Sequence, residues 1–311
     1  MRFFDPVLTR LKLENYPCLP ESAMMSHKRK DRLHCGRQVR HCLLLLILAL
    51  FCLNCSSAGG GDSDTSASNV KNVHYVDTVG TNFLFRGERP LTGDGITSAV
   101  FNLDGLKRAI AEQAEVAGVT LPPSYTLVVI SLLWLNDVEN PEQAAKERGL
   151  LFEEISFFKA NPQIGQVNSW ASKGTGLSPL DTSLSSVRDY LAMNLDSWLS
   201  DPQVWRVEKL RAWLENPSEL GITGPVVIYV HCFGGCDRTG ELIGSYAMRY
   251  MDKSWEEMNS LNKGCCRIDG TTGETIYATE NCNALRWYGL WLNLKFGLSL
   301  HWDNPAKCCN L

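Results

Sequence analysis

The chain has 311 residues, a net charge of −4 and a hydrophobic content of 44%. This length allows one large or two ordinary domains with a sizeable core. Residues 1–58 hold nine basic and four acidic residues, whereas the rest of the chain holds 21 basic and 30 acidic residues. The acidic remainder argues against nucleic acid as a partner.

The N-terminal region has the three parts of a signal peptide. Basic residues at 28–40 precede an apolar run at 43–53, and small residues follow it, with Ser56 and Ala58 at the −3 and −1 places of a cleavage site. The run spans 11 residues, fewer than the roughly 17–25 that cross a membrane. We therefore expect a secreted or luminal protein, with membrane anchoring by residues 43–55 as the alternative.

Composition divides the chain into three regions. Residues 1–58 form an N-terminal extension, residues 59–73 form a linker rich in Gly, Ser and Asp, and residues 74–311 form one domain with a cysteine-containing tail. We expect membrane contact only through an uncleaved N-terminal segment.

Seven cysteines follow the extension: Cys232, Cys236, Cys265, Cys266, Cys282, Cys308 and Cys309. If Cys232 stays reduced, the other six could form up to three disulfides, and the sequence leaves about 15 pairings open. We favour one or two bridges between the C-terminal tail and the loop after Lys263. The two cysteine doublets fit no metal spacing, so no zinc site is predicted.

Periodicity and turn residues predict the elements before the loop at 159–183. They are an entry strand and turn at 82–90, a helix at 103–117 closed by Gly118, a buried strand at 127–132, a short helix that starts at Asn140-Pro141 and ends at Gly149, and a partly alternating strand at 150–157.

More helices are predicted after that loop. They are a helix at 183–199, a helix to about residue 215 with Asp201 as its N-cap, a capping box at Ser254–Glu257 and a last helix at 279–296. Strands that alternate with helices predict an α/β fold, with a central, mostly parallel sheet flanked by helices.

The most informative segment is His-Cys-Phe-Gly-Gly-Cys-Asp-Arg-Thr-Gly at 231–240, between an apolar run at 226–230 and a helical pattern at 241–250. A strand, a glycine-containing loop and a helix N-terminus present several backbone N–H groups to one anion. Ligands bind at the carboxyl ends of such strands. We expect the following residues to bind phosphate: Phe233, Gly234, Gly235, Cys236, Asp237 and Arg238.

Side chains of the same segment suit phosphate chemistry. Arg238 can hold two oxygens with its planar fork. The positive field of the loop favours the thiolate of Cys232, which makes it nucleophilic. We expect His231 to fix the loop and tune Cys232, and the Thr239 hydroxyl to assist departure of the thiolate. Cys236 is close enough in sequence to trap Cys232 in a reversible disulfide.

This segment resembles the H-C-x-x-G-x-x-R-[ST] signature of the protein tyrosine and dual-specificity phosphatase superfamily, and the order of elements over about 74–296 resembles the dual-specificity domain. The resemblance implies hydrolysis through a phosphocysteine on Cys232, with a general acid that protonates the leaving oxygen. It implies no metal or organic cofactor.

The general acid is where this chain departs from the family. It has no Trp-Pro-Asp tripeptide, and Asp181 is the only acidic residue of the corresponding loop at 159–183. Asp181 could instead cap the next helix. Asp237 is the competing candidate, because an Asp before the signature Arg is similar to myotubularins, Sac-type lipid phosphatases and some secreted bacterial tyrosine phosphatases. Both assignments stay open.

Three functions are compatible with these residues. By resemblance, the expected activity is that of a protein tyrosine or dual-specificity phosphatase acting on a phosphorylated protein. Asp237 motivates the alternative of a phosphoinositide or inositol phosphate phosphatase. A catalytically silent protein that binds phosphorylated ligands is the third reading, against which the intact Cys232, Arg238 and Thr239 count.

Overall fold

The computed structural model describes the following residues: 70–93, 98–135, 140–199, 201–262, 267–268, 275–276 and 279–303. The predicted signal segment, most of the linker and the two cysteine doublets lie outside these residues. No helix within the described ranges is long and apolar enough to cross a membrane.

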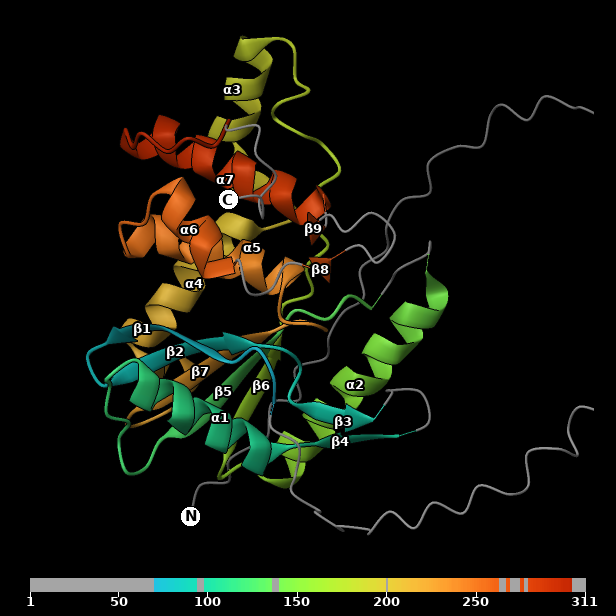
Figure 1. The fold of residues 1–311 in the computed structure, drawn as a ribbon, viewed down its shortest axis with the longest axis vertical. Coiled ribbons are helices and arrows are strands. Elements are labelled where there is room, and N and C mark those ends of the chain that lie inside the picture. The colour runs from blue at the N-terminus through green and yellow to red at the C-terminus, as the bar shows by residue number, and fades with distance from the viewer. Residues whose placement is uncertain are drawn as a thin grey trace, which may run out of the picture. The chain divides into compact units, whose positions relative to one another are not determined.

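A five-stranded sheet forms the centre of the fold, in the order β1 (His74–Val79), β2 (Asn82–Gly87), β7 (Val226–His231), β5 (Thr126–Ser131) and β6 (Gly165–Ser169) (Figure 1). Only the β1–β2 pair is antiparallel. Every residue of β7 is buried, because a middle strand of a parallel sheet has layers on both faces. The predicted α/β fold with a mostly parallel sheet is confirmed.

Helices complete the two outer layers: α1 (Leu103–Val116), α2 (Pro141–Ala160), α3 (Ser185–Met193), α4 (Gln203–Glu215), α5 (Asp237–Tyr250), α6 (Trp255–Asn262) and α7 (Thr279–Phe296). The smaller elements are the strand pair β3 (Leu91–Gly93) and β4 (Ala99–Phe101), the pair β8 (Arg267–Ile268) and β9 (Thr275–Ile276), and 3-10 helices at Leu195–Ser197 and Pro217–Leu220.

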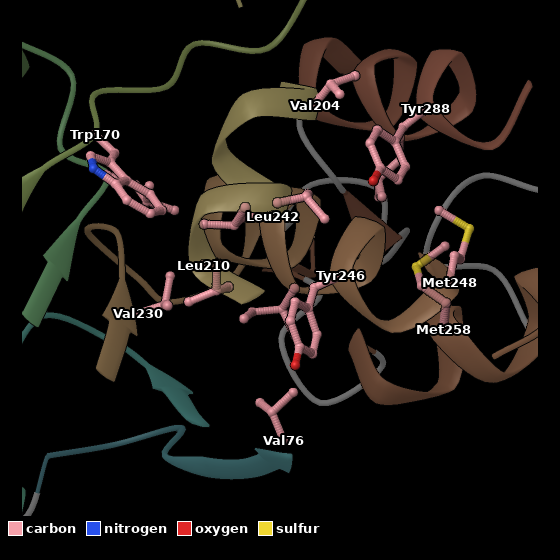
Figure 2. Packing of buried hydrophobic residues seen from close by; sticks show 14 of the residues in the cluster. Val76, Trp170, Val204, Leu210, Val230, Leu242, Tyr246, Met248, Met258 and Tyr288 are labelled. Atoms are coloured by element: carbon pink, nitrogen blue, oxygen red, sulfur yellow. The ribbon is translucent and has the colours of Figure 1, made fainter. Parts of the chain in front are cut away.

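Alternation along the strands divides the core into two clusters. On β7, Val227 and Tyr229 pack with residues of α1 and α2, whereas Ile228 and Val230 pack with residues of α4, α5 and α7. Figure 2 shows part of the second cluster, in which Val230 lies near Leu210 of α4. Because successive side chains of a strand point to opposite faces, the all-apolar sequence of β7 serves both layers.

Several predicted elements are confirmed. The helix at 279–296 matches α7, and the helix at 103–117 matches α1 to within one residue. The capping box also forms: the Glu257 N–H donates to Ser254 Oγ at 3.2 Å, and the Ser254 N–H donates to Glu257 Oε2 at 2.9 Å. These elements carry strong local signals, namely apolar periodicity and capping residues.

The short helix ended by Gly149 and the strand at 150–157 are wrong, because α2 runs unbroken through both. Its buried residues Leu150, Glu154 and Phe158 recur every four positions and face the sheet layer. A glycine inside a helix costs only about 1 kcal/mol relative to alanine. Packing of this buried face therefore overrides the local signal of Gly149. The sequence analysis also missed β6, whose residues are mostly polar.

Two predicted helix starts also differ. The N-cap of α4 is Pro202, without a side-chain cap bond, and Asp201 is instead buried in an ion pair with Arg206. A carboxylate at 3% exposure needs a charged partner more than a helix end needs a cap. The helix predicted at 183–199 is interrupted at Asn194, which ends α3 and accommodates a short 3-10 turn.

We predict that Gly165→Ala destabilises the β5–β6 pairing. A Cβ at this position would lie 1.7 Å from the backbone oxygen of Leu127, so the two strands would have to separate. We expect urea unfolding to show a loss of about 3 kcal/mol. Gly176→Ala is the control, since a Cβ there meets nothing within 4 Å. Equal stability of the two variants would contradict the close approach.

Candidate active site

The signature segment occupies the predicted place at the carboxyl edge of the sheet. The strand β7 ends at His231, α5 begins at Asp237, and five residues connect them. The strands β2 and β5 flank β7 on its two sides. The loop therefore lies over the middle of the sheet, at the N-terminus of α5, where a helix leaves its first N–H groups without partners inside the helix.

Two arginines at the end of β2 and just after it hold carbonyl groups of the loop. The buried Arg86 donates from Nη2 to the Gly235 carbonyl at 2.7 Å. Arg89 donates from Nη1 to the Phe233 carbonyl at 3.2 Å, and its guanidinium lies 3.9 Å from the centre of the Phe233 ring. Sequence analysis noted this entry strand and turn but gave neither arginine a role in the site.

These bonds orient the peptide units of the loop. In a trans peptide the C=O and the following N–H point in opposite directions, and the described residues contain no cis peptide. With the Phe233 and Gly235 carbonyls turned toward the arginines, the N–H groups of Gly234 and Cys236 point to the other side. The arrangement produces adjacent donors on one side of the loop, as an anion cradle requires.

Glycine is required at one of the two loop positions. Gly235 has a φ of +74°, and a Cβ there would lie 2.3 Å from the carbonyl oxygen of Gly87. At Gly234 an added Cβ would meet nothing within 4 Å among the described residues. Among these two glycines, a close backbone approach is therefore seen at Gly235 alone, where the loop passes the end of β2.

Arg238 is held in place by a carboxylate from α2. Its Nη1 and Nη2 donate to the two carboxylate oxygens of Glu147 at 2.6 and 2.8 Å, and Nη1 also donates to the Leu132 carbonyl at 3.1 Å. Nε and the second hydrogen of Nη2 have no acceptor in the described part of the chain. These two donors are parallel, the geometry in which a guanidinium binds two oxygens of one phosphate.

The pairing changes the ionisation of both groups. Burial alone would raise the pKa of Glu147, but the hydrogen bonds and charge of Arg238, with bonds from Gln143 and the Trp134 N–H, bring this pKa below 4.5. Burial alone would lower the pKa of Arg238, but Glu147 and the nearby Cys232 raise it. Both groups are therefore charged at neutral pH.

The nucleophile candidate and its neighbours are close together. Cys232 and Cys236 are free thiols, and Cys232 is 2% exposed. The Cys236 Sγ contacts the Gly234 carbonyl at 3.4 Å. The Thr239 hydroxyl is buried without a hydrogen-bond partner in the described residues, so it is available to a sulfur or a ligand. The predicted reversible bridge between the two thiols is absent from this state and stays a prediction.

His231 is fully buried behind the loop. Its Nδ1 lies 3.1 Å from the Cys232 carbonyl, and its Nε2 lies 3.0 Å from Glu154 Oε1. His231 therefore contacts the loop, and its predicted tuning of Cys232 stays a prediction. Neither Glu147 nor Glu154 was foreseen, and the wrong strand at 150–157 concealed Glu154 because it placed that residue outside a helix.

The two general-acid candidates differ in position. Asp237 is the first residue of α5, within the signature segment. Asp181 is exposed, and its N–H bonds to the Ser178 carbonyl at 3.3 Å. No hydrogen bond or ion pair among the described residues joins Asp181 to residues 231–240. It does not cap α3 either, because the N-cap there is Leu184.

The loop that carries Asp181 is anchored away from the signature segment at several points. The Thr175 N–H donates to the Glu280 carbonyl at 3.0 Å, and Trp287 Nε1 donates to the Leu177 carbonyl at 2.8 Å. Both partners belong to α7. The loop is therefore tied to the helical layer over this part of its length.

A buried polar cluster holds the beginning of the same loop. Arg206 of α4 donates to the Ala171 carbonyl at 2.6 Å and pairs with Asp201. The Ser172 hydroxyl donates to Glu241 of α5 at 3.4 Å. Burial and the nearby charge of Asp201 raise the pKa of Glu241 well above its usual value. The cluster fixes the end of β6 to the signature helix.

Cys282 of α7 is disulfide-bonded. The pairing predicted between the C-terminal tail and the loop after Lys263 falls on residues outside the described ranges and stays a prediction. Among the described residues, no group of three or more His, Cys, Asp or Glu side chains could hold a metal ion.

No protein-family model and no curated protein matches this sequence. Among solved structures, the chain is similar to the PTP-2 phosphatase of Cydia pomonella, with 15% identity and a TM-score of 0.28 over 68% of this chain and 88% of that one. It is also similar to the Yvh1 phosphatase domain of Chaetomium thermophilum, with 12% identity and a TM-score of 0.31 over 72% and 96% of the two chains. Such values carry no inference, so the site is assigned from its own residues.

We predict that Glu147→Gln destabilises the fold at neutral pH, because it leaves the charge of Arg238 buried without a partner. The loss should be about 3–5 kcal/mol in urea unfolding. The lowered pKa of Glu147 makes its contribution complete above pH 4.5, and this contribution is lost as the pH falls through the native value. The difference from the wild type should therefore shrink in acid.

Glu142→Gln is the matched control on the same helix. Glu142 is exposed and pairs with Lys146 one turn away, so its loss should cost less than about 1 kcal/mol. A difference between wild type and Glu147→Gln that stays constant from pH 7 to pH 3 would contradict the role assigned to the ion pair.

Proposed function

We propose that this chain is a cysteine-dependent phosphomonoester hydrolase of the protein tyrosine and dual-specificity phosphatase superfamily. One observation carries the proposal: a free Cys232 and the guanidinium of Arg238 lie at the two ends of one loop. Within this loop, the Phe233 and Gly235 carbonyls accept from Arg89 and Arg86, which leaves the following N–H groups pointing to the opposite side. Nucleophile, anion cradle and charge-bearing donor come together on one strand–loop–helix unit, which the signature sequence alone implies only by resemblance.

The mechanism follows from the properties of these groups. Loop N–H groups and the two available donors of Arg238 hold the phosphate oxygens. The Cys232 thiolate attacks phosphorus, the phosphorus–oxygen bond of the ester breaks, and the leaving oxygen takes a proton from a general acid. Water then attacks the phosphocysteine and gives a proton to the same group, which now acts as a general base; the sulfur–phosphorus bond breaks, and inorganic phosphate and free thiolate are released. Thr239 is proposed to assist departure of the sulfur.

We propose a phosphorylated protein as substrate, with phosphotyrosine as the default residue. A phosphoinositide or inositol phosphate is the second candidate, because Asp237 lies within the signature segment as it does in lipid-directed members of the family. The signal-like segment at 28–58 supports action in the secretory pathway or outside the cell. There, the oxidising surroundings would act on the free Cys232 and Cys236.

We predict that residues 59–311 hydrolyse p-nitrophenyl phosphate and that Cys232→Ser abolishes this activity. Serine is a far weaker nucleophile at neutral pH. Activity should rise with reductant if oxidation of Cys232 keeps a fraction of the molecules inactive. The control is Glu142→Gln, an exposed substitution on α2 that should leave the activity unchanged. If the fully reduced protein is inactive, the catalytic proposal fails and a phosphate-binding protein remains.

We further predict that one of Asp181→Asn and Asp237→Asn acts as a general-acid variant. Its rate should fall by about 10²–10⁴-fold on a phosphopeptide, whose leaving group needs a proton. The loss should be much smaller on p-nitrophenyl phosphate, whose leaving group departs without one. If neither variant shows this dependence on the leaving group, both assignments are wrong. Parallel assays on phosphopeptides and phosphoinositides would separate the two substrate classes.

A further inference from the structure

Two carboxylates of α2 face the two ends of the signature segment. Glu147 and Glu154 are seven residues apart, which is about two helical turns and places them on one face. Glu147 binds Arg238, and Glu154 lies 3.0 Å from His231. The first pair has an evident role in holding the phosphate-binding arginine. The second pair is buried more deeply, with both side chains 0% exposed, and the mechanism above gives it no role.

The hydrogen positions in this second pair follow from its partners. The Cys232 carbonyl can only accept, so His231 Nδ1 must carry a hydrogen. His231 Nε2 lies 3.0 Å from Glu154 Oε1, but the contact lacks hydrogen-bond alignment, and neither oxygen of Glu154 has a hydrogen-bond partner among the described residues. An ionised carboxylate without a partner at zero exposure is prohibitively costly. The buried pair must therefore hold a proton, either on Glu154 or on Nε2.

The groups around this pair are an aromatic hydroxyl and the cations beside the loop. The imidazole belongs to His231, the residue next to Cys232, whereas Glu154 approaches the imidazole from α2. Alternation on β7 places His231 on the same face as Tyr229, whose ring stacks against it at 6.0 Å. The Tyr229 hydroxyl donates to the Glu88 carbonyl at 2.6 Å, so it does not compete for the proton. Arg86, Arg89 and Arg238 are the other cations beside the loop.

We propose that Glu154 is a positioning residue that holds His231 doubly protonated behind the nucleophile. The imidazolium then donates to the Cys232 carbonyl and places a positive charge next to the thiolate. This bond also turns the Phe233 N–H away from His231 and toward the anion cradle, as in the other units of the loop. The inference rests on the proposed function, since it assigns Glu154 to the activation of Cys232.

The sign of the expected effect distinguishes two cases. In Glu154→Gln the negative charge disappears. If His231 loses its proton as a result, Cys232 loses the nearer positive charge, and its thiolate forms only at higher pH. If His231 keeps its proton, Cys232 loses only the more distant negative charge, and the thiolate forms at lower pH. A purely structural role moves the profile in neither direction.

The test is the pH profile of Cys232 alkylation by iodoacetamide on the reduced full chain, resolved from Cys236 by tandem mass spectrometry. We expect Glu154→Gln to move the midpoint upward by about one pH unit, which is a roughly tenfold loss of thiolate below the midpoint. Glu153→Gln is the matched control, an adjacent and half-buried carboxylate. A downward shift or no shift would overturn the proposal.

A second measurement does not depend on folding of the variant. The ¹⁵N chemical shifts of His231 in the unmodified chain at pH 7 distinguish an imidazolium from a neutral ring. Two protonated nitrogens are expected, and a neutral ring would overturn the proposal. Both measurements are independent of turnover. An inactive protein with the expected shifts would therefore refute the proposed function and leave the role of Glu154 intact.

Discussion

The candidate site depends on how the polar groups of one half-buried loop, residues 232–236, are partnered. The carbonyls of residues 232, 233 and 235 each contact a side chain, from His231, Arg89 and Arg86. An unpartnered carbonyl at this depth would cost about 1–3 kcal/mol, so these bonds stabilise the loop and at the same time orient it. The loop N–H groups point to one side because the carbonyls of the same peptide units are held on the other.

His231 and Arg238 each need a partner for their own polar groups, and this need explains the position of α2. His231 and Arg238 are charged or polar groups at the edge of an apolar core, and a buried charge without a partner is strongly destabilising. The helix α2 supplies Glu147 and Glu154 from one face. Its length and straight course through Gly149 are therefore tied to the site, since a helix ending at Gly149 would leave His231 without its carboxylate.

The opposite side of the site is organised differently. The loop after β6 begins at a buried cluster of Asp201, Arg206 and Glu241 and then runs along α7, so its polar groups are satisfied by the helical layer. Asp181 takes part in none of these contacts with its side chain and is exposed. The loop after β7 and Arg238 are thus held in place in this state, while Asp181, one candidate acid, has no hydrogen bond or ion pair with them among the described residues.

The sequence by itself singled out Cys232 and the glycine-containing loop after it, because the residues suited to phosphate chemistry are concentrated in ten adjacent positions between an apolar strand and a helix. It also determined α1, α7 and the capping box, whose signals are local. Only the tertiary structure showed the partners Glu147, Arg86 and Arg89, which lie 91, 149 and 144 residues from the loop residues they bind. Local periodicity has no information on such distances. In sequence, a buried glutamate cannot be distinguished from a surface one, because its burial depends on how its helix packs. The same packing explains why α2 continues through Gly149, which the local pattern predicts as the end of a helix.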